Sequence, residues 1–424
     1  MIVLIEGTIA MAGTFASMLF AYLFHLFMVR MLPESAYGDL SLCIGFYMIL
    51  QVAFSSLQTV LARDVAKLES GKKRKQAETL FANYFQLGLA AGALTGIGIL
   101  LLLPLAIMAF GESVRGGILA LCIVMPPTYI AIVLRGWLQG REKIIPLSFN
   151  VALSTLGKLV AGVIFVAAGF GLTGAALSIA VGFGLCVIVL PGPVGLAFRK
   201  MMEERLVRKN KKMAVKQKDA KSRKSLLSII ATNILLTTFL YLDLIFVRAL
   251  LSPKDAGYYN VAGITAKVLY FAVSGLVLAL LPKSSKLVLG RDSKAVKRLL
   301  AISFFLLAPI MLFFAAFPEF IIRLFYTSKY LPAVGTFRIL TIGMSFFAAF
   351  LVLVNILWSQ NEEGLPLVLS IIAILADIAL LFWLTPLYGI EGAATATLVC
   401  SALLLVPTAV IVFLKMKKRP AKTI

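Results

Sequence analysis

Apolar stretches of 20 or more residues alternate with short polar segments along the whole chain. A helix that rises 1.5 Å per residue needs about 20 apolar residues to cross the ~30 Å hydrocarbon layer of a bilayer. The pattern therefore predicts twelve membrane-spanning helices. Their expected ranges are 7–32, 38–62, 80–110, 116–139, 145–169, 173–198, 225–251, 256–281, 299–327, 333–358, 365–387 and 391–414.

The second half of the chain repeats the first half. Val-Arg-x-Leu occurs at 29–32 and 247–250, and Gly-(Leu/Ile)-x-Gly-Ala-Ala occurs at 171–176 and 389–394, both at an offset of 218. A third block, Trp-x-Gln-x-x-Glu, recurs in the same order at an offset of 221. Ordered matches of this kind indicate a duplicated bundle. Two copies of one bundle are typical of transporters that work by alternating access about a site near the bilayer midplane.

The repeat predicts an all-α membrane protein made of two six-helix lobes. The N-terminal lobe is expected at 1–198 and the C-terminal lobe, with a basic cytoplasmic tail, at 225–424. A basic cytoplasmic linker at 199–224 joins them, with twelve Lys or Arg residues against three acids. Such a linker suits contact with anionic membrane lipids.

Composition excludes an ordinary soluble domain, because 61% of the residues are hydrophobic, 14% are charged and the mean hydropathy is +0.98. The first apolar segment lacks the short basic start and small-residue cleavage site of a signal peptide, so we expect it to be retained. The four cysteines lie in apolar segments without metal-ligand spacing. The sequence therefore predicts neither a metal site nor a cofactor.

The net charge of +22 is distributed unevenly between the predicted loops. Alternate loops, together with the C-terminal tail, carry 31 Lys or Arg residues, whereas the intervening loops carry three. This positive-inside pattern predicts that both termini are cytoplasmic. It also accounts for the basic charge without a nucleic-acid partner.

Seven basic residues lie within or at the edges of predicted helices. Five are close enough to helix ends to reach the membrane–water interface: Arg30, Arg135, Arg248, Arg323 and Arg338. Lys158 and Lys267 lie well inside their segments. A charge near the bilayer centre costs about 2.5–3.5 kcal/mol even on the lenient insertion scale, so these two lysines are expected to line a cavity.

His25, Asp243 and Asp377 are further ionisable groups inside predicted helices. The repeat places His25 opposite Asp243, and Lys158 within one residue of the equivalent of Asp377. One hypothesis is that His25, Arg30, Lys158 and Lys267 bind an anionic headgroup, while Asp243 and Asp377 act as counter-charges or bind a coupling cation. The alternative is a static ion pair, either Lys158 with Asp377 or Asp243 with Arg248.

Several segments resemble the multidrug/oligosaccharidyl-lipid/polysaccharide (MOP) exporter superfamily, and within it the Wzx-like oligosaccharide flippases. The resemblance covers nearly the whole chain. It rests on Val-Arg-Met-Leu-Pro at 29–33 with Ala-Tyr-Gly at 36–38, Arg-Gly-x-Leu-Gln-Gly at 135–140, Ala-Gly-Tyr-Tyr at 256–259 and Tyr-Gly-Ile-Glu-Gly-Ala-Ala at 388–394.

The resemblance implies a V-shaped pair of lobes in the plasma membrane that moves a glycan on a polyprenyl phosphate or pyrophosphate from the cytoplasmic to the outer leaflet. Membrane lipids and glycan biosynthesis enzymes would be its partners. Fixed cations in an apolar cleft suit such a phosphate headgroup.

Two other functions remain open from the sequence. A proton- or sodium-coupled multidrug or metabolite antiporter of the same superfamily would use Asp243 and Asp377 as its membrane-embedded acids. A membrane glycan polymerase or ligase would ordinarily need a large outer loop or a positioned acid–base group. The predicted outer loops are short and the chain has one histidine, so we expect a protein that is not an enzyme.

Overall fold

The computed structural model describes the backbone of residues 2–207, 220–289, 293–360 and 362–417, and every regular element in these ranges is a helix. Its contacts divide the chain into two compact units, unit 1 (Met1–Lys216) and unit 2 (Gln217–Ile424). The division falls inside the predicted linker, of which residues 208–219 lie outside the described residues.

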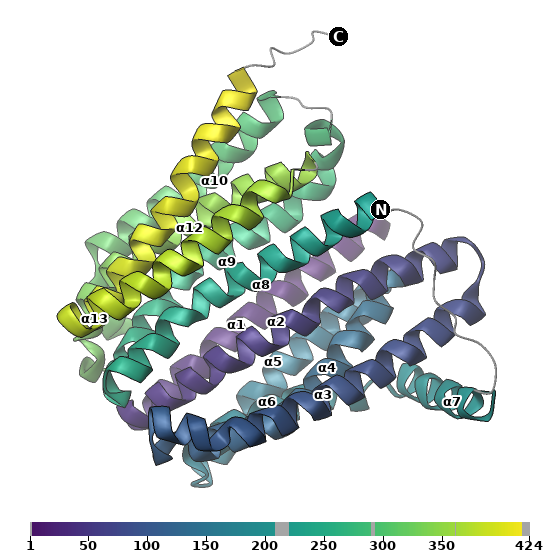
Figure 1. Cartoon of the computed structure of the whole chain (residues 1–424), viewed down its shortest axis with the longest axis horizontal. Helices are drawn as coiled ribbons and strands as arrows, with labels where there is room; N and C mark the ends of the chain where they lie inside the picture. Colours follow the sequence, from purple (N-terminus) through teal and green to yellow (C-terminus); the bar gives the residue numbers. More distant parts are fainter. Residues whose placement is uncertain (1, 208–219, 290–292, 361, 418–424) are drawn as a thin grey trace. The chain divides into compact units, whose positions relative to one another are not determined.

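Unit 1 contains the first seven helices in Figure 1. They are α1 (Ile2–Met31), α2 (Glu34–Ser70), α3 (Arg74–Phe110), α4 (Arg115–Gly140), α5 (Ile144–Ala167), α6 (Gly171–Ile188) and α7 (Pro191–Val207). A 3₁₀ turn, η1 (Glu112–Val114), precedes α4. Helix α5 packs between α1 and α6, and α4 packs against α2, α3 and α6.

Unit 2 contains the remaining six helices. They are α8 (Ala220–Leu250), α9 (Pro253–Leu289), α10 (Ser293–Ala316), α11 (Pro318–Phe325), α12 (Ala333–Ser359) and α13 (Gly364–Lys417), with the 3₁₀ turn η2 (Ser328–Tyr330) before α12. The long α13 consists of two helices that meet at Gly389, whose φ of 62° and ψ of −142° are not helical.

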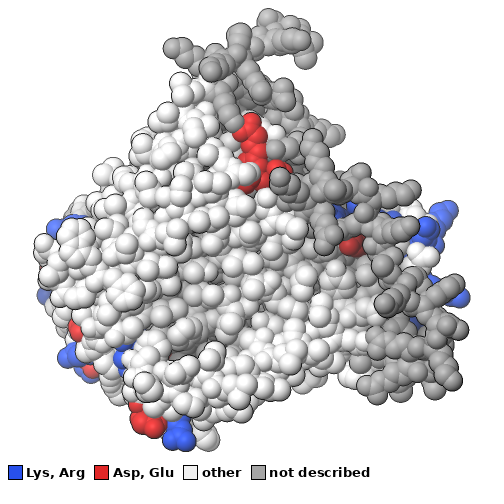
Figure 2. Space-filling view, viewed as in Figure 1, with Lys and Arg blue, Asp and Glu red and all other residues white. Residues whose placement is uncertain are grey.

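Within the described ranges, nine helices are long and apolar enough to cross a bilayer, or ten if the bent pair α10 and α11 forms one span. Since α13 holds two helices and α9 is 37 residues long, the described helices are compatible with the twelve predicted spans. The face shown in Figure 2 carries charged residues mainly at its margins. The protein is therefore a multi-pass membrane protein.

Two predicted helices are shorter than expected. The sixth ends at Ile188, and Pro191 starts the separate helix α7. The ninth breaks after Ala316, and α11, which begins at Pro318, is bent by 85° relative to α10. Both breaks lie at a proline that starts a helix, because proline lacks a backbone donor and disfavours helical geometry in the residue before it.

Backbone geometry and close contacts at paired glycines agree with the internal repeat. Gly171 and Gly389, which the repeat pairs, have φ values of 48° and 62°. A Cβ on Gly116 would overlap Thr173 Oγ1 in unit 1, and a Cβ on Gly335 would overlap the Glu391 carboxylate in unit 2. The two units therefore use glycine at equivalent positions where helices approach closely.

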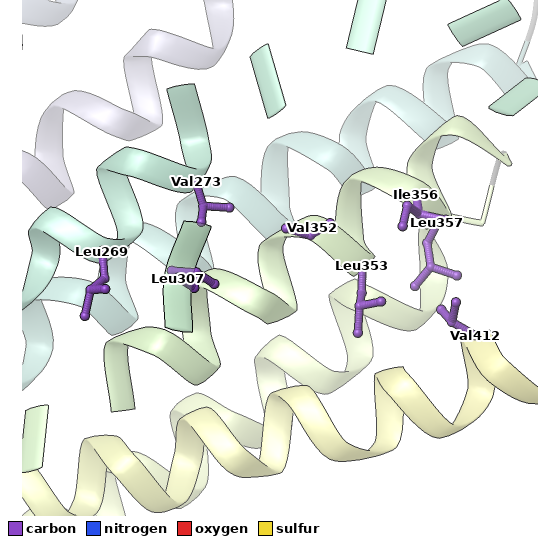
Figure 3. Packing of buried hydrophobic residues seen from close by; sticks show 9 residues of the cluster. Leu269, Val273, Leu307, Val352, Leu353, Ile356, Leu357 and Val412 are labelled. Atoms are coloured by element: carbon purple, nitrogen blue, oxygen red, sulfur yellow. The ribbon is translucent and has the colours of Figure 1, made fainter. Parts of the chain in front are cut away.

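The core of unit 2 is a continuous apolar cluster between α9, α10, α12 and α13 (Figure 3). The cluster takes Leu269 and Val273 from α9, Val352 and Leu353 from α12, and Leu307 from α10. Each of these side chains is at most 7% exposed. This packing fixes the helices that carry the polar groups of unit 2.

We expect Gly182→Ala to destabilise unit 1. A Cβ at Gly182 would overlap the Ser154 carbonyl oxygen and lie 2.9 Å from the Lys158 nitrogen, so α5 and α6 would have to separate. The cost of such overpacking is about 1–3 kcal/mol. The unfolding temperature in detergent measures it. Gly184→Ala is the matched control, because no atom lies within 4 Å of its Cβ position, and an equal loss in both variants would contradict the prediction.

Candidate functional site

Lys158 is half-buried on α5 and reaches toward α1. Its Nζ lies 4.3 Å from the centroid of the Phe24 ring. This cation–π contact is the one interaction of the ammonium group with the described residues, which offer it neither a hydrogen bond nor an ion pair. The lysine thus keeps its donors available on the inner side of unit 1.

His25 lies next to Phe24 on α1, and Tyr37 comes from the start of α2. The Tyr37 hydroxyl is 3.3 Å from His25 Nδ1, and the His25 ring meets the edge of Phe24 with a centroid distance of 5.4 Å. Phe24 therefore contacts both His25 and Lys158. The structure brings together these two residues that the sequence analysis proposed for one site.

Arg135 of α4 is held inside unit 1 by helices α5 and α6. Its Nε donates to Asn150 Oδ1 at 3.0 Å, and its Nη2 donates to Ser154 Oγ at 2.8 Å. Its guanidinium carbon lies 5.2 Å from the Phe183 ring centroid. Asn150 in turn donates to the Cys186 carbonyl at 3.1 Å. Arg135 is therefore bound by side chains of the bundle and does not extend freely toward the end of α4.

Ser154 of α5 links the two cations: it accepts a hydrogen bond from Arg135 of α4, and it lies one helical turn before Lys158 on the same face of α5. Among the described residues of unit 1, no carboxylate forms an ion pair with either cation. Buried cations are normally paired because desolvation costs several kcal/mol per ion. This part of unit 1 therefore suits an anion supplied from outside the protein.

The other predicted cations are distributed differently. Arg30 is exposed at the end of α1, and Arg323 and Arg338 are exposed in unit 2, in keeping with helix-end positions. Arg248 is 5% exposed, so its side chain is covered by protein rather than by lipid or water.

Asp243 of α8 is 2% exposed and fully engaged in hydrogen bonds. Its Oδ2 accepts from the Tyr259 hydroxyl of α9 at 2.7 Å, and its Oδ1 accepts from the Leu244 backbone nitrogen at 2.7 Å. The Tyr259 hydroxyl also lies 3.5 Å from Thr397 Oγ1 of α13. The Asp243–Arg248 ion pair considered from the sequence is not formed.

Asp377 of α13 is completely buried, and neither carboxylate oxygen has a hydrogen-bond partner of normal geometry among the described residues. The thiol of Cys400 lies beside it, and its charge interacts with that of Asp243. A buried carboxylate without donors costs free energy unless a proton or a cation neutralises it. Asp377 is thus the unsatisfied member of a buried acidic pair.

Lys267 of α9 is 6% exposed and lies in unit 2 with Asp243. Its Nζ is 4.2 Å from the centroid of the Tyr241 ring, and its charge attracts that of Asp243.

The described residues contain no group of three or more His, Cys, Asp or Glu side chains placed to hold a metal ion. Any cation at Asp243 and Asp377 would therefore use hydroxyl or backbone oxygens as further ligands.

The sequence analysis did not assign three residues of these clusters to a candidate site: Arg135, Tyr259 and Thr397. Arg135 and Tyr259 both lie in segments that carry the family resemblance, so those segments held the signal. Thr397 lies on α13, and its side chain is buried.

Solved structures with the same fold are membrane transporters. The inward-facing structure of a multidrug resistance MATE family transporter of the MOP superfamily has a TM-score of 0.74 at 14% identity, covering 95% of this chain and 96% of that chain. The MATE multidrug transporter DinF-BH, solved as a complex with a bound compound, has a TM-score of 0.70 at 15% identity, covering 96% and 94%.

A MOP superfamily transporter from Pyrococcus furiosus, described as having a binding pocket of reverse polarity that suggests a different function, has a TM-score of 0.60 at 14% identity, with coverage of 98% and 95%. At these identities the likeness shows the fold. No curated protein matches the sequence significantly.

The family comparison places the chain more narrowly. Residues 4–288 match the family described as "Polysaccharide biosynthesis protein", a range that covers nearly all of unit 1 and extends almost to the end of α9. This range exceeds half of the chain and includes the segments at 29–38, 135–140 and 256–259. The chain therefore belongs to the polysaccharide biosynthesis protein family.

Proposed function

We propose that this transporter is a flippase that moves a polyprenyl-phosphate- or pyrophosphate-linked oligosaccharide from the cytoplasmic to the outer leaflet of the cell membrane. The observation that carries the proposal is the pair Arg135 and Lys158 in unit 1. Both cations lie inside a membrane bundle, and neither has a carboxylate partner among the described residues of that unit. A phosphate headgroup supplies the missing anion.

The two cations suit different parts of that task. The Arg135 guanidinium is oriented by Asn150 and Ser154, which accept two of its five N–H groups and leave others for phosphate oxygens. Lys158 is a point charge held over an aromatic ring, so its donors can follow a moving headgroup. We propose that His25, with its Tyr37 hydroxyl, borders the same site, and that exposed Arg30 meets the headgroup at the end of α1.

In this proposal unit 2 supplies the drive. Asp377 has no hydrogen-bond donor of normal geometry among the described residues, whereas Asp243 has two. Uptake of a proton or a monovalent cation by Asp377 removes an uncompensated charge, and its release restores that charge. Such a change favours one packing of the bundle over another, which is the energetic requirement of alternating access. The positive charge of Lys267 attracts the Asp243 carboxylate and so lowers the free-energy cost of burying that carboxylate in its charged form.

Reconstitution tests the function directly. Proteoliposomes are loaded in one leaflet with a fluorescent polyprenyl diphosphate that carries an oligosaccharide, and the fraction reached by an impermeant quencher is followed in time. We expect the protein to accelerate exchange of this lipid and to leave exchange of a neutral fluorescent diacylglycerol unchanged. Equal rates with and without protein would overturn the proposal.

A second function is favoured by the acidic pair of unit 2 and by the fold that the chain shares with MATE multidrug transporters. As an antiporter, the protein would export an organic cation in exchange for protons or sodium. The same proteoliposomes distinguish the two functions. Gradient-driven efflux of a fluorescent rhodamine cation, without lipid exchange, would identify the antiporter.

A further inference from the structure

Helix α2 carries a row of uncharged polar side chains on one side. Its members are Tyr47, Gln51, Ser55 and Gln58, spaced four, four and three residues apart. At 100° per residue they fall within about 80° of the helix circumference, and they extend along about 16 Å of its axis. Buried Leu61 and Val65 continue the same side of α2, so the row faces the inner part of unit 1.

The row begins beside the proposed phosphate site. The ring of Phe183 lies 5.2 Å from the Arg135 guanidinium carbon and 6.4 Å from the ring of Tyr47. From there, α2 is held against α4 by Phe54, which stacks on Tyr129 at 4.1 Å, and by the Tyr129 hydroxyl, which donates to the Leu50 carbonyl at 3.1 Å. The row is therefore carried on a fixed helix.

Much of the hydrogen-bonding capacity of the row is unused. The Tyr47 hydroxyl donates to Gln51 Oε1 at 2.9 Å, but the Gln51 amide nitrogen has only the Met48 sulfur, 3.5 Å away, as an acceptor among the described residues. Gln58 Nε2 donates to Gln139 Oε1 at 3.0 Å, which leaves Gln58 Oε1 and the Gln139 amide nitrogen without a described partner. Gln51 and Gln58 are half-buried and Gln139 is exposed, so these amide groups remain accessible to a polar occupant.

We propose that this row binds the sugar residues of the lipid-linked substrate while Arg135 and Lys158 hold its phosphate. Sugar hydroxyls both donate and accept, and so do the amides and hydroxyls of the row, whereas the row has no charge that would select an ion. Its length suits an oligosaccharide rather than a single sugar. The inference rests on the proposed flippase function and adds to it the place where the glycan is recognised.

Binding measurements with two ligands test this inference. The probes are a polyprenyl diphosphate bearing a neutral oligosaccharide, taken from a panel of common hexose and N-acetylhexosamine chains, and the same lipid without sugar. We expect the native protein in detergent to bind at least one glycan-bearing lipid more tightly than the bare lipid. Gln51→Leu and Gln58→Leu each remove amide groups, and each should weaken glycan-lipid binding roughly 5- to 10-fold while leaving bare-lipid binding unchanged.

Gln76→Leu is the matched control, because Gln76 is exposed at the start of α3 and lies outside the row. Equal unfolding temperatures show that the variants are folded. If the row variants retain the native preference for glycan-bearing lipid, or if native protein binds bare and glycan-bearing lipids equally across the panel, the inference is wrong and the headgroup site stands. If native protein binds neither lipid, the flippase proposal itself fails.

Discussion

Lys158→Met is expected to lower flipping of a glycan-bearing polyprenyl diphosphate by about 10- to 100-fold, the equivalent of one charge-assisted hydrogen bond of about 1.5–3 kcal/mol. Lys158 has no acidic partner among the described residues, so its charge is free to attract a phosphate. Methionine keeps much of the length and the contact with Phe24 while removing the ammonium.

The same substitution should not lower the unfolding temperature of the protein, because the half-buried ammonium has a ring contact and no ion pair to lose among the described residues. Stability and transport therefore change independently, which separates a binding role from a structural one. Lys158→Arg, which retains the charge, should keep a larger share of the rate. Lys143→Met, at an exposed turn, is the control and should transport normally.

Lys267→Met distinguishes two roles for the second membrane lysine. If Lys267 binds the headgroup, its replacement should weaken binding of the polyprenyl diphosphate, as we expect for Lys158→Met. If Lys267 is the counter-charge of Asp243, its replacement should leave that binding intact and change the ion dependence of transport.

For the first prediction, normal flipping by Lys158→Met, with protein at native abundance in the vesicles, would exclude Lys158 from the headgroup site.

Asp377→Asn is expected to raise stability and to remove the response of transport to an ion gradient. The carboxylate is completely buried without a hydrogen-bond donor of normal geometry, and leaving such a group unsatisfied costs about 1–3 kcal/mol. An amide in its place carries no charge to neutralise. The unfolding temperature in detergent should rise, while flipping should become insensitive to imposed proton and sodium gradients.

Asp243→Asn is the matched comparison and should change stability in the opposite direction. Asp243 accepts from the Tyr259 hydroxyl and the Leu244 nitrogen, and an amide can accept through only one of its two heavy atoms. A fall in stability for Asp377→Asn would show that Asp377 is a structural partner and would contradict its proposed role in ion uptake. Retained gradient dependence in that variant would do the same.

The membrane spans and the repeat are readable from the sequence because both depend on local composition. A run of apolar residues long enough to cross the bilayer identifies a span whatever it packs against. The matching segments at 171–176 and 389–394 likewise predicted equivalent geometry, and Gly171 and Gly389 both have positive φ. The predicted sixth and ninth spans run past the breaks before Pro191 and Pro318, because hydropathy alone does not register a change of helix direction.

The surroundings of the charged residues depended on the tertiary structure. Arg135 stands near a helix end in the sequence, yet Asn150 and Ser154, 15 and 19 residues away, hold it inside the bundle. Asp243 and Asp377 are both single carboxylates in apolar segments, yet one receives a hydroxyl from Tyr259 and the other receives no donor of normal geometry from the described residues. Hydropathy locates an ionisable residue along a span, but its partners come from other helices, so packing decides which charges are satisfied and which remain to bind a ligand.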